Sequence, residues 1–333
     1  MPLPPREDRA KQDGASVYWV GHSLMNNVDA RVEGAQNVME LVGRFADARG
    51  EEYAHYDHTL WGSALHFNWR GKGHGDDRDD AKPRADRAYL RDHGNEYDNF
   101  VFTEVVPIEG ALDWAYSIYY LRKFYCEALR RRPDATMFLY EVWRHAQPDD
   151  PEALDFETQV LRDRRYWDEL ADNALGPRVD DPGRAGRWLG RLGIRENHCN
   201  PTQPIYLIPA ATGLSALSRE LSALGSDAPV SSWGMPTVIG DAFANAYIDW
   251  PPSRQADFEG LTARDPSAEH DSIHLSAMGS YFVALVAYAT VYASDPSGLP
   301  ALNGVSEGLA PLLQRVAWKT VTSDERSGVR PVF

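Results

Sequence analysis

Residues 17–24 read Val-Tyr-Trp-Val-Gly-His-Ser-Leu, an apolar run of strand length that ends in a Gly-x-Ser-Leu turn. Four further runs have the length of a strand, and they lie at Glu52–Tyr56, Phe100–Thr103, Thr136–Tyr140 and Ile205–Ile208. Short apolar runs of this kind are typical of strands buried inside a sheet. The sequence therefore predicts five strands, of which the one at Glu52–Tyr56 is the least apolar.

Segments of helical period follow the first, third and fifth of these strands, at Val38–Arg49, Trp114–Arg131 and Gly213–Leu224. Strands that alternate with helices predict a parallel sheet covered on both faces. We therefore expect an α/β fold, a three-layer α/β/α sandwich around a five-stranded parallel sheet. Ligands bind such sheets outside the carboxyl ends of the strands, where Ser23, Glu104 and Glu141 are expected to share one rim.

The chain has 333 residues, 43% of them hydrophobic, which is enough to bury a large core. We expect a flexible N-terminal segment at 1–15, one α/β domain at 16–295, and a C-terminal extension at 296–333 packed on that domain. Insertions are expected at about 145–203 and 226–269. The second is rich in aromatic side chains, which suits either a lid over the substrate or a small satellite core.

The net charge of −15 argues against binding to nucleic acid or anionic lipid, because both are polyanions. No run approaches the roughly 18 consecutive apolar residues of a membrane span. The polar, proline-rich start of the chain predicts a cytoplasmic protein, although a secreted chain without its signal would look the same. Cys126 and Cys199 are expected to be separate reduced thiols rather than a disulfide. The oligomeric state is left open.

Ser23 is expected where the first strand turns toward a helix. Its hydroxyl would be exposed there, beside backbone N–H groups that could stabilise an oxyanion. The alternative is a serine that only caps the helix. The turn therefore supplies a candidate nucleophile.

The sequence Asp271-Ser272-Ile273-His274 precedes a second feature of interest, a long apolar helix predicted at Ala277–Tyr292 with Ser276 as its N-cap. On the loop that enters this helix, Asp271 could accept the Nδ1–H of His274 while Nε2 faces a nucleophile. The alternative is that these polar residues are only an exposed segment before a capped helix. Together with Ser23, the loop supplies the three roles of acyl-transfer catalysis.

These two motifs together resemble the SGNH, or GDSL-like, hydrolase family. The resemblance runs from residue 17 to 292 and implies a flavodoxin-like strand order. It also implies Ser23 as nucleophile, His274 as general base and Asp271 as the acid that orients it. The family's oxyanion glycine would be Gly62, in Leu60-Trp61-Gly62-Ser63, acting with the backbone N–H of Ser23.

The sequence departs from the family pattern at two positions. His22 stands before the serine where the family usually has aspartate. The family's Gly-x-Asn-Asp block after the third strand is replaced by Phe102-Thr103-Glu104-Val105, and an ionised carboxylate cannot donate a hydrogen bond. Either two backbone donors suffice, or Glu104 plays another role such as holding a substrate hydroxyl. Asn26 and Asn27, just past Ser23, are candidate substitutes for the missing donor.

Substrate-binding candidates lie at the rim, namely Glu104, Glu141 and Trp143. An indole that stacks on a pyranose and carboxylates that accept its hydroxyls would suit a carbohydrate. The alternative is that Trp143 packs under the insertion while Glu141 pairs with Arg144. A glycosidase built on the two glutamates is a further possibility, but it leaves the pairing of serine with histidine unexplained.

Other chemistries have less support in the sequence. We expect no cofactor, since no Gly-x-Gly-x-x-Gly or Walker-type Gly-Lys-Ser/Thr is present. We also expect no metal, because the run His74-Gly75-Asp76-Asp77 is more typical of a solvated loop. The sequence thus predicts a serine esterase acting on an acyl ester, in particular an acetyl ester of a carbohydrate. The alternatives are an acyltransferase with the same triad, or a non-catalytic binding protein on the same fold.

Overall fold

The computed structural model describes residues 3–4, 14–28, 33–70, 81–144, 156–176, 199–224 and 273–330. The insertion predicted at 226–269 lies outside the described residues, and so does most of the one predicted at 145–203. Asp271 and the run His74 to Asp77 also lie outside them.

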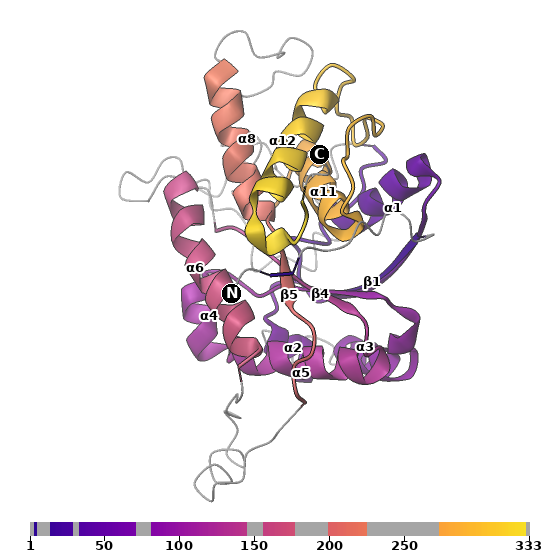
Figure 1. The fold of residues 1–333 in the computed structure, drawn as a ribbon, viewed down its shortest axis with the longest axis vertical. Coiled ribbons are helices and arrows are strands. Elements are labelled where there is room, and N and C mark those ends of the chain that lie inside the picture. Colours follow the sequence, from indigo (N-terminus) through magenta and orange to yellow (C-terminus); the bar gives the residue numbers. More distant parts are fainter. Residues whose placement is uncertain are drawn as a thin grey trace, which may run out of the picture.

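Five parallel strands form one sheet at the centre of the molecule (Figure 1). They are β1 (Gly14–Gly21), β2 (Glu52–Thr59), β3 (Asn99–Phe102), β4 (Thr136–Tyr140) and β5 (Ile205–Ile208). Their order is β2-β1-β3-β4-β5, and Val17 of β1 lies in register between His55 of β2 and Asn99 of β3. The predicted fold class and flavodoxin-like order are confirmed.

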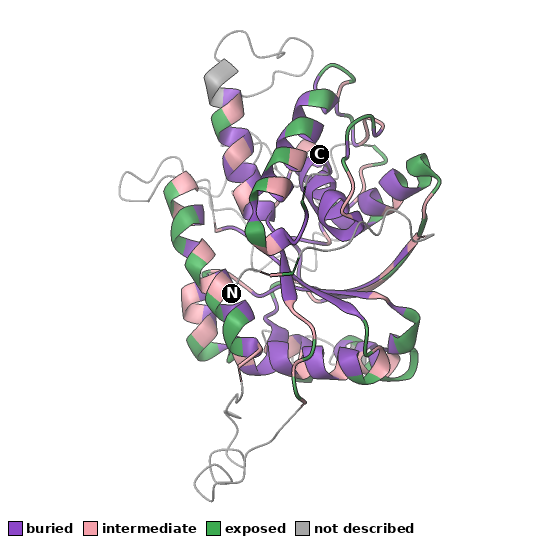
Figure 2. Ribbon diagram, in the orientation of Figure 1, coloured by how far each residue is buried: buried purple, intermediate pink, exposed green. Residues whose placement is uncertain are grey.

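Helices cover both faces of this sheet (Figure 1). One layer consists of α1 (Val38–Arg49), α8 (Ala210–Leu224), α11 (Ala277–Tyr292) and α12 (Ala310–Ser323). The opposite layer consists of α2 (Leu65–Arg70), α3 (Ala81–His93), α4 (Ile108–Trp114), α5 (Ser117–Arg131) and α6 (Phe156–Ala174). Short 3₁₀ turns lie at Gly94–Glu96 and Glu325–Ser327. Figure 2 shows that the buried residues of both layers face the sheet.

The apolar helix α11 is the centre of its layer, with α1, α8 and α12 packed around it. All its residues but one are buried, so the long apolar run serves the core. Its N-cap is Ser276, whose hydroxyl accepts the Gly279 N–H at 3.1 Å, as predicted. None of the helices in the described ranges is long and apolar enough to cross a membrane.

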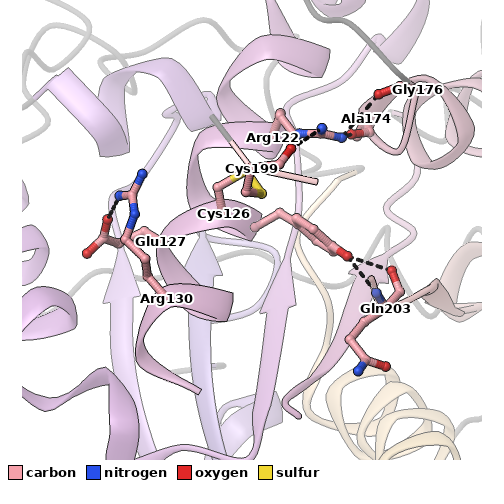
Figure 3. Close-up of a disulfide and its surroundings, with 9 residues drawn as sticks. Arg122, Cys126, Glu127, Arg130, Ala174, Gly176, Cys199 and Gln203 are labelled. Carbon is pink, nitrogen blue, oxygen red and sulfur yellow. Dashed lines mark hydrogen bonds and ion pairs between the residues drawn. A yellow bond between two sulfur atoms is a disulfide. The ribbon is translucent and has the colours of Figure 1, made fainter. Parts of the chain in front are cut away.

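The two cysteines form a disulfide, so the prediction of separate thiols was wrong (Figure 3). Cys126 on α5 is bonded to Cys199, just before β5, with their Cα atoms 5.6 Å apart. The 73 positions that separate them in sequence gave no sign of this proximity. The bond ties the chain leading into β5 to the helix layer beneath it.

Polar contacts surround this disulfide on α5 (Figure 3). The buried guanidinium of Arg122 donates to the carbonyls of Ala174 at 2.5 Å and Cys199 at 2.6 Å. One turn further, the Tyr125 hydroxyl donates to the carbonyl of Gln203 at 2.7 Å and accepts its N–H at 2.9 Å. Side chains of α5 thereby satisfy backbone groups that would otherwise be buried without partners.

Candidate active site

The Oγ atom of Ser23 lies 2.8 Å from the Nε2 atom of His274. Ser23 follows β1 and His274 precedes α11, so the two come from opposite ends of the chain. A serine hydroxyl that donates to a neutral imidazole nitrogen has the arrangement of a nucleophile with its general base. The structure therefore brings together two of the three predicted catalytic residues, while Asp271 lies outside the described residues.

The loop that carries Ser23 is a turn rather than the start of a helix. The Met25 N–H donates to the His22 carbonyl at 3.0 Å, and α1 begins only at Val38. The N-cap of α1 is instead Asn37, whose side chain accepts the N–H of Glu40. Capping therefore does not account for the serine at this position.

Gly21 allows this turn to approach its neighbours closely. A Cβ at this position would lie 2.6 Å from the Thr103 Cγ2 atom and 2.7 Å from the Met25 Sδ atom. Both distances are shorter than real Cβ contacts. A glycine is needed here because β3 and the turn itself crowd the end of β1.

His22 stands where the resembled family usually has aspartate, and its ring bonds to two backbone groups. Its Nδ1 accepts the Leu24 N–H at 3.4 Å, which leaves Nε2–H to donate to the Glu104 carbonyl at 3.1 Å. Burial lowers the pKa of His22 to about 4, so the ring is neutral near pH 7. The imidazole thereby joins the nucleophile turn to the end of β3.

Gly62 lies in the turn after β2, with a left-handed φ of 61° that favours glycine. This turn adjoins the end of β1, since the Leu60 N–H donates to the Gly21 carbonyl at 3.0 Å. The same carbonyl accepts the side-chain amide of Asn68 at 3.0 Å. Gly62 is therefore on the same rim as Ser23, and its oxyanion role stays a prediction.

Glu104 is fully buried just after β3. One of its carboxylate oxygens accepts the Val105 N–H at 2.9 Å and the Leu65 N–H, at the first residue of α2, at 3.2 Å. Burial raises its pKa to about 7, because the charged form is poorly solvated there. The carboxylate fixes the start of α2, and with it the turn that contains Gly62. The hydrogen bonds seen are to the protein's own groups, and the predicted contact with a substrate hydroxyl stays a prediction.

Glu141, just after β4, is also fully buried. Its carboxylate accepts the Thr212 N–H at 2.9 Å and the Thr212 hydroxyl at 3.2 Å, near the start of α8. Burial raises its pKa to about 7. Arg144, the partner considered in the sequence, instead contacts Asp163 and Glu109. Like Glu104, this carboxylate is used to hold a helix on the rim.

Trp143 is only 1% exposed. Its indole N–H donates to the Ile273 carbonyl at 2.8 Å. Ile273 is the residue before His274. The ring is therefore buried, and its N–H contacts the loop that carries the predicted base.

A polar cluster around Asn26, in the nucleophile turn, was not predicted from the sequence. The Asn26 amide donates to Asp57 at 2.6 Å and to Thr59 at 3.1 Å, and it accepts from Asn37 at 2.9 Å. These bonds use both ends of the Asn26 amide and connect the turn to β2 and α1. In contrast, the amide nitrogen of buried Asn27 has no hydrogen-bond partner among the residues that the structure describes. Within the described ranges, no group of three or more histidine, cysteine or acidic side chains is arranged to hold a metal.

Comparisons with known proteins do not assign the chain to a family. No family model matches the sequence, and no curated protein matches it. Among solved structures, the chain is similar to a crystal structure of a DUF4886 family protein from Bacteroides uniformis ATCC 8492. The identity is 13% and the TM-score 0.49, over 93% of this chain and 95% of that chain. These comparisons assign no function to the chain.

Proposed function

We propose that the chain is a serine esterase in which Ser23 is the nucleophile and His274 the general base. The observation that carries this proposal is the 2.8 Å separation between the Ser23 Oγ and the His274 Nε2. The turn around Ser23 adds support, because Gly21, His22 and the Asn26 cluster fix its backbone from several sides. A serine that served packing alone would need no imidazole at this distance.

The proposed reaction has two steps. The Ser23 Oγ attacks the ester carbonyl carbon as its proton passes to the His274 Nε2, and the backbone N–H groups of Ser23 and Gly62 stabilise the oxyanion. The tetrahedral intermediate collapses, and the alcohol leaves with the proton from His274. Water then attacks the acyl-enzyme with the same base and releases the acid. Asp271 would accept the His274 Nδ1–H throughout, as the resemblance to SGNH hydrolases implies.

The identity of the ester substrate rests on other residues than the catalytic pair. A carbohydrate acetyl ester was inferred from Glu104, Glu141 and Trp143, and these three side chains are buried. The part of that inference that rested on rim side chains thus finds no support in the described residues. We retain acetyl esters as the first substrates to test, on the family resemblance alone. An acyl acceptor other than water would use the same residues.

A binding protein without turnover is the second candidate function. Glu104 favours it, because the resembled family has an asparagine donor there and this carboxylate accepts backbone N–H groups instead. The two candidates differ in whether Ser23 is activated. Only the enzyme requires a hydroxyl that reacts faster than those of other serines.

Labelling by a fluorophosphonate probe, followed by intact-mass analysis, tests this difference. The wild-type protein should gain one adduct that maps to Ser23, and Ser23→Ala should gain none. Ser63→Ala is the matched control, since Ser63 is another buried serine at the rim whose hydroxyl contacts only the Trp61 carbonyl among the bonds described. It should be labelled like the wild type. A folded wild-type protein without an adduct would favour the binding protein.

We also propose that the chain works in an oxidising compartment, in place of the cytoplasm expected from the sequence. The disulfide between Cys126 and Cys199 supports this location, because such bonds persist mainly outside the reducing cytosol. Alkylation of the protein in intact native cells, before lysis, tests it. Both thiols should resist the reagent unless a reductant is added first.

A further inference from the structure

The segment Tyr140–Arg144, which begins at the last residue of β4, contacts the chain next to both residues of the candidate catalytic pair. The hydroxyl of Tyr140, the last residue of β4, donates to the Leu24 carbonyl at 3.4 Å. Three residues later, the Trp143 indole N–H donates to the Ile273 carbonyl at 2.8 Å. These carbonyls belong to the residues that adjoin Ser23 and His274. One short segment therefore reaches the nucleophile turn and the loop of the base together.

This segment is itself held in place on both sides of Trp143. Before the ring, the Glu141 carboxylate is fixed by the N–H and hydroxyl of Thr212 at the start of α8. After it, the guanidinium of Arg144 is bonded to Asp163 of α6 and to Glu109 of α4. Its charged partners raise the pKa of Arg144 above its usual value, so the charge is permanent. Trp143 is thus anchored to three helices through its neighbours.

The loop of His274 needs such an anchor. The N-cap of α11 is Ser276, so His274 lies outside the helix and its backbone is not fixed by helical hydrogen bonds. The Ile273 carbonyl belongs to the peptide plane that joins Ile273 to His274. A donor bonded to that oxygen sets the tilt of the plane, and hence the direction in which the imidazole leaves the backbone.

We propose that Trp143 is a positioning residue that aims the His274 imidazole at the Ser23 hydroxyl, an inference that rests on the proposed function. Its indole N–H is bonded to the Ile273 carbonyl, and the side chain is buried, with 1% exposed. Its effect is on the geometry of proton transfer, in which a displacement of about 1 Å can cost roughly 100-fold in rate. Because the side chain is buried, we expect substrate binding to change little.

The test is Trp143→Phe, with p-nitrophenyl acetate as substrate. This variant keeps an aromatic ring and removes the N–H. We expect kcat to fall roughly 10- to 100-fold while KM changes less than about threefold. The matched control is Trp19→Phe, because Trp19 is also fully buried and its indole N–H donates to the Tyr53 hydroxyl at 3.1 Å on a neighbouring strand. The control should lose stability without this loss of kcat.

A second variant separates the N–H from the shape of the ring. Site-specific replacement of Trp143 by benzothienylalanine keeps the bicyclic form and supplies no donor, so it should fold and still show the lower kcat. Full kcat in this variant, or equal kcat in Trp143→Phe and Trp19→Phe, would overturn the inference while the esterase stands. If the folded wild type shows no hydrolysis that depends on Ser23, the proposed function falls and the inference falls with it.

Discussion

Ser23 and His274 lie 251 positions apart in sequence, yet their side chains meet at 2.8 Å. Each is attached to one of the most deeply buried elements, β1 in the sheet and α11 in the helix layer above it. α11 packs against α1, which follows β1 in the chain. The packing of the core therefore brings the pair together.

Replacement of the proposed base should abolish turnover while the fold remains. His274→Gln keeps a polar side chain of similar size but cannot take the serine proton. We expect kcat for p-nitrophenyl acetate to fall by roughly 10⁴-fold or more, as in other serine hydrolases that lose a member of the triad. His93→Gln, at an exposed histidine paired with Glu96, is the control and should behave as wild type. Activity within tenfold of wild type in His274→Gln would assign the base elsewhere.

Gly21→Ala should damage both stability and labelling at Ser23. The added methyl group would lie 2.6 Å from Thr103 and 2.7 Å from Met25, so the turn must shift. Overpacking of this kind costs about 1–3 kcal/mol in the free energy of unfolding. The fluorophosphonate reaction at Ser23 should slow in parallel. Urea unfolding measures the stability of the variant, and the rate of labelling is measured on the same sample.

The control for this change is Gly110→Ala in α4. There a Cβ meets only the Trp114 ring, at the ordinary distance of 3.6 Å. Alanine favours helices over glycine by about 1 kcal/mol, so this variant should be as stable as wild type or more stable. If Gly21→Ala were labelled at the wild-type rate, the close packing of the turn would be irrelevant to the nucleophile.

Glu104→Gln should make the protein more stable above neutral pH. The folded state raises the pKa of this carboxyl from 4.5 to about 7, so between these values the unfolded chain releases a proton that the folded chain keeps. Stability therefore falls as pH rises through this window, by about 3 kcal/mol at most, and stays lower above it. Glutamine carries no charge, and its carbonyl oxygen can still accept from Leu65 and Val105.

Urea unfolding at pH 5 and pH 8 measures this effect. The stability of Glu104→Gln relative to wild type should increase between the two pH values. Glu307→Gln, at an exposed carboxylate, should show little such change. A relative stability of Glu104→Gln that is the same at both pH values would mean that Glu104 is ionised in the folded state without cost.

Much of the sheet and several helices could be predicted because hydrophobic patterning determines them. β4, β5, α1 and α11 have the predicted bounds. β2 gave a weaker signal because it is an edge strand whose first half is largely exposed. The helix predicted from Trp114 begins instead at Ser117, since Trp114 ends α4 and a left-handed Tyr116 separates the two helices.

Only those site residues that belong to short sequence motifs could be predicted. Ser23 and His274 stand in recognisable local patterns, next to a strand and before a capped helix. The contacts that support them do not, because they join residues far apart in sequence, as in the bond between Trp143 and Ile273 over 130 positions. A tryptophan at a strand end suggests a sugar platform as readily as a buried donor. Only the tertiary structure separates these two roles.

Removal of the disulfide should lower stability without abolishing the site. The bond closes a loop of 73 positions, for which loop-closure entropy predicts about 4 kcal/mol, and measured values are typically 2–4 kcal/mol. The double variant Cys126→Ser, Cys199→Ser should therefore unfold at lower urea concentration. Arg122 and Tyr125 continue to hold the same chain segment, so the variant should still fold. Reductant should lower the midpoint of the wild type to that of the variant and leave the variant unchanged. A wild type insensitive to reductant, and equal to the variant in stability, would show that the thiols are not joined in the folded protein.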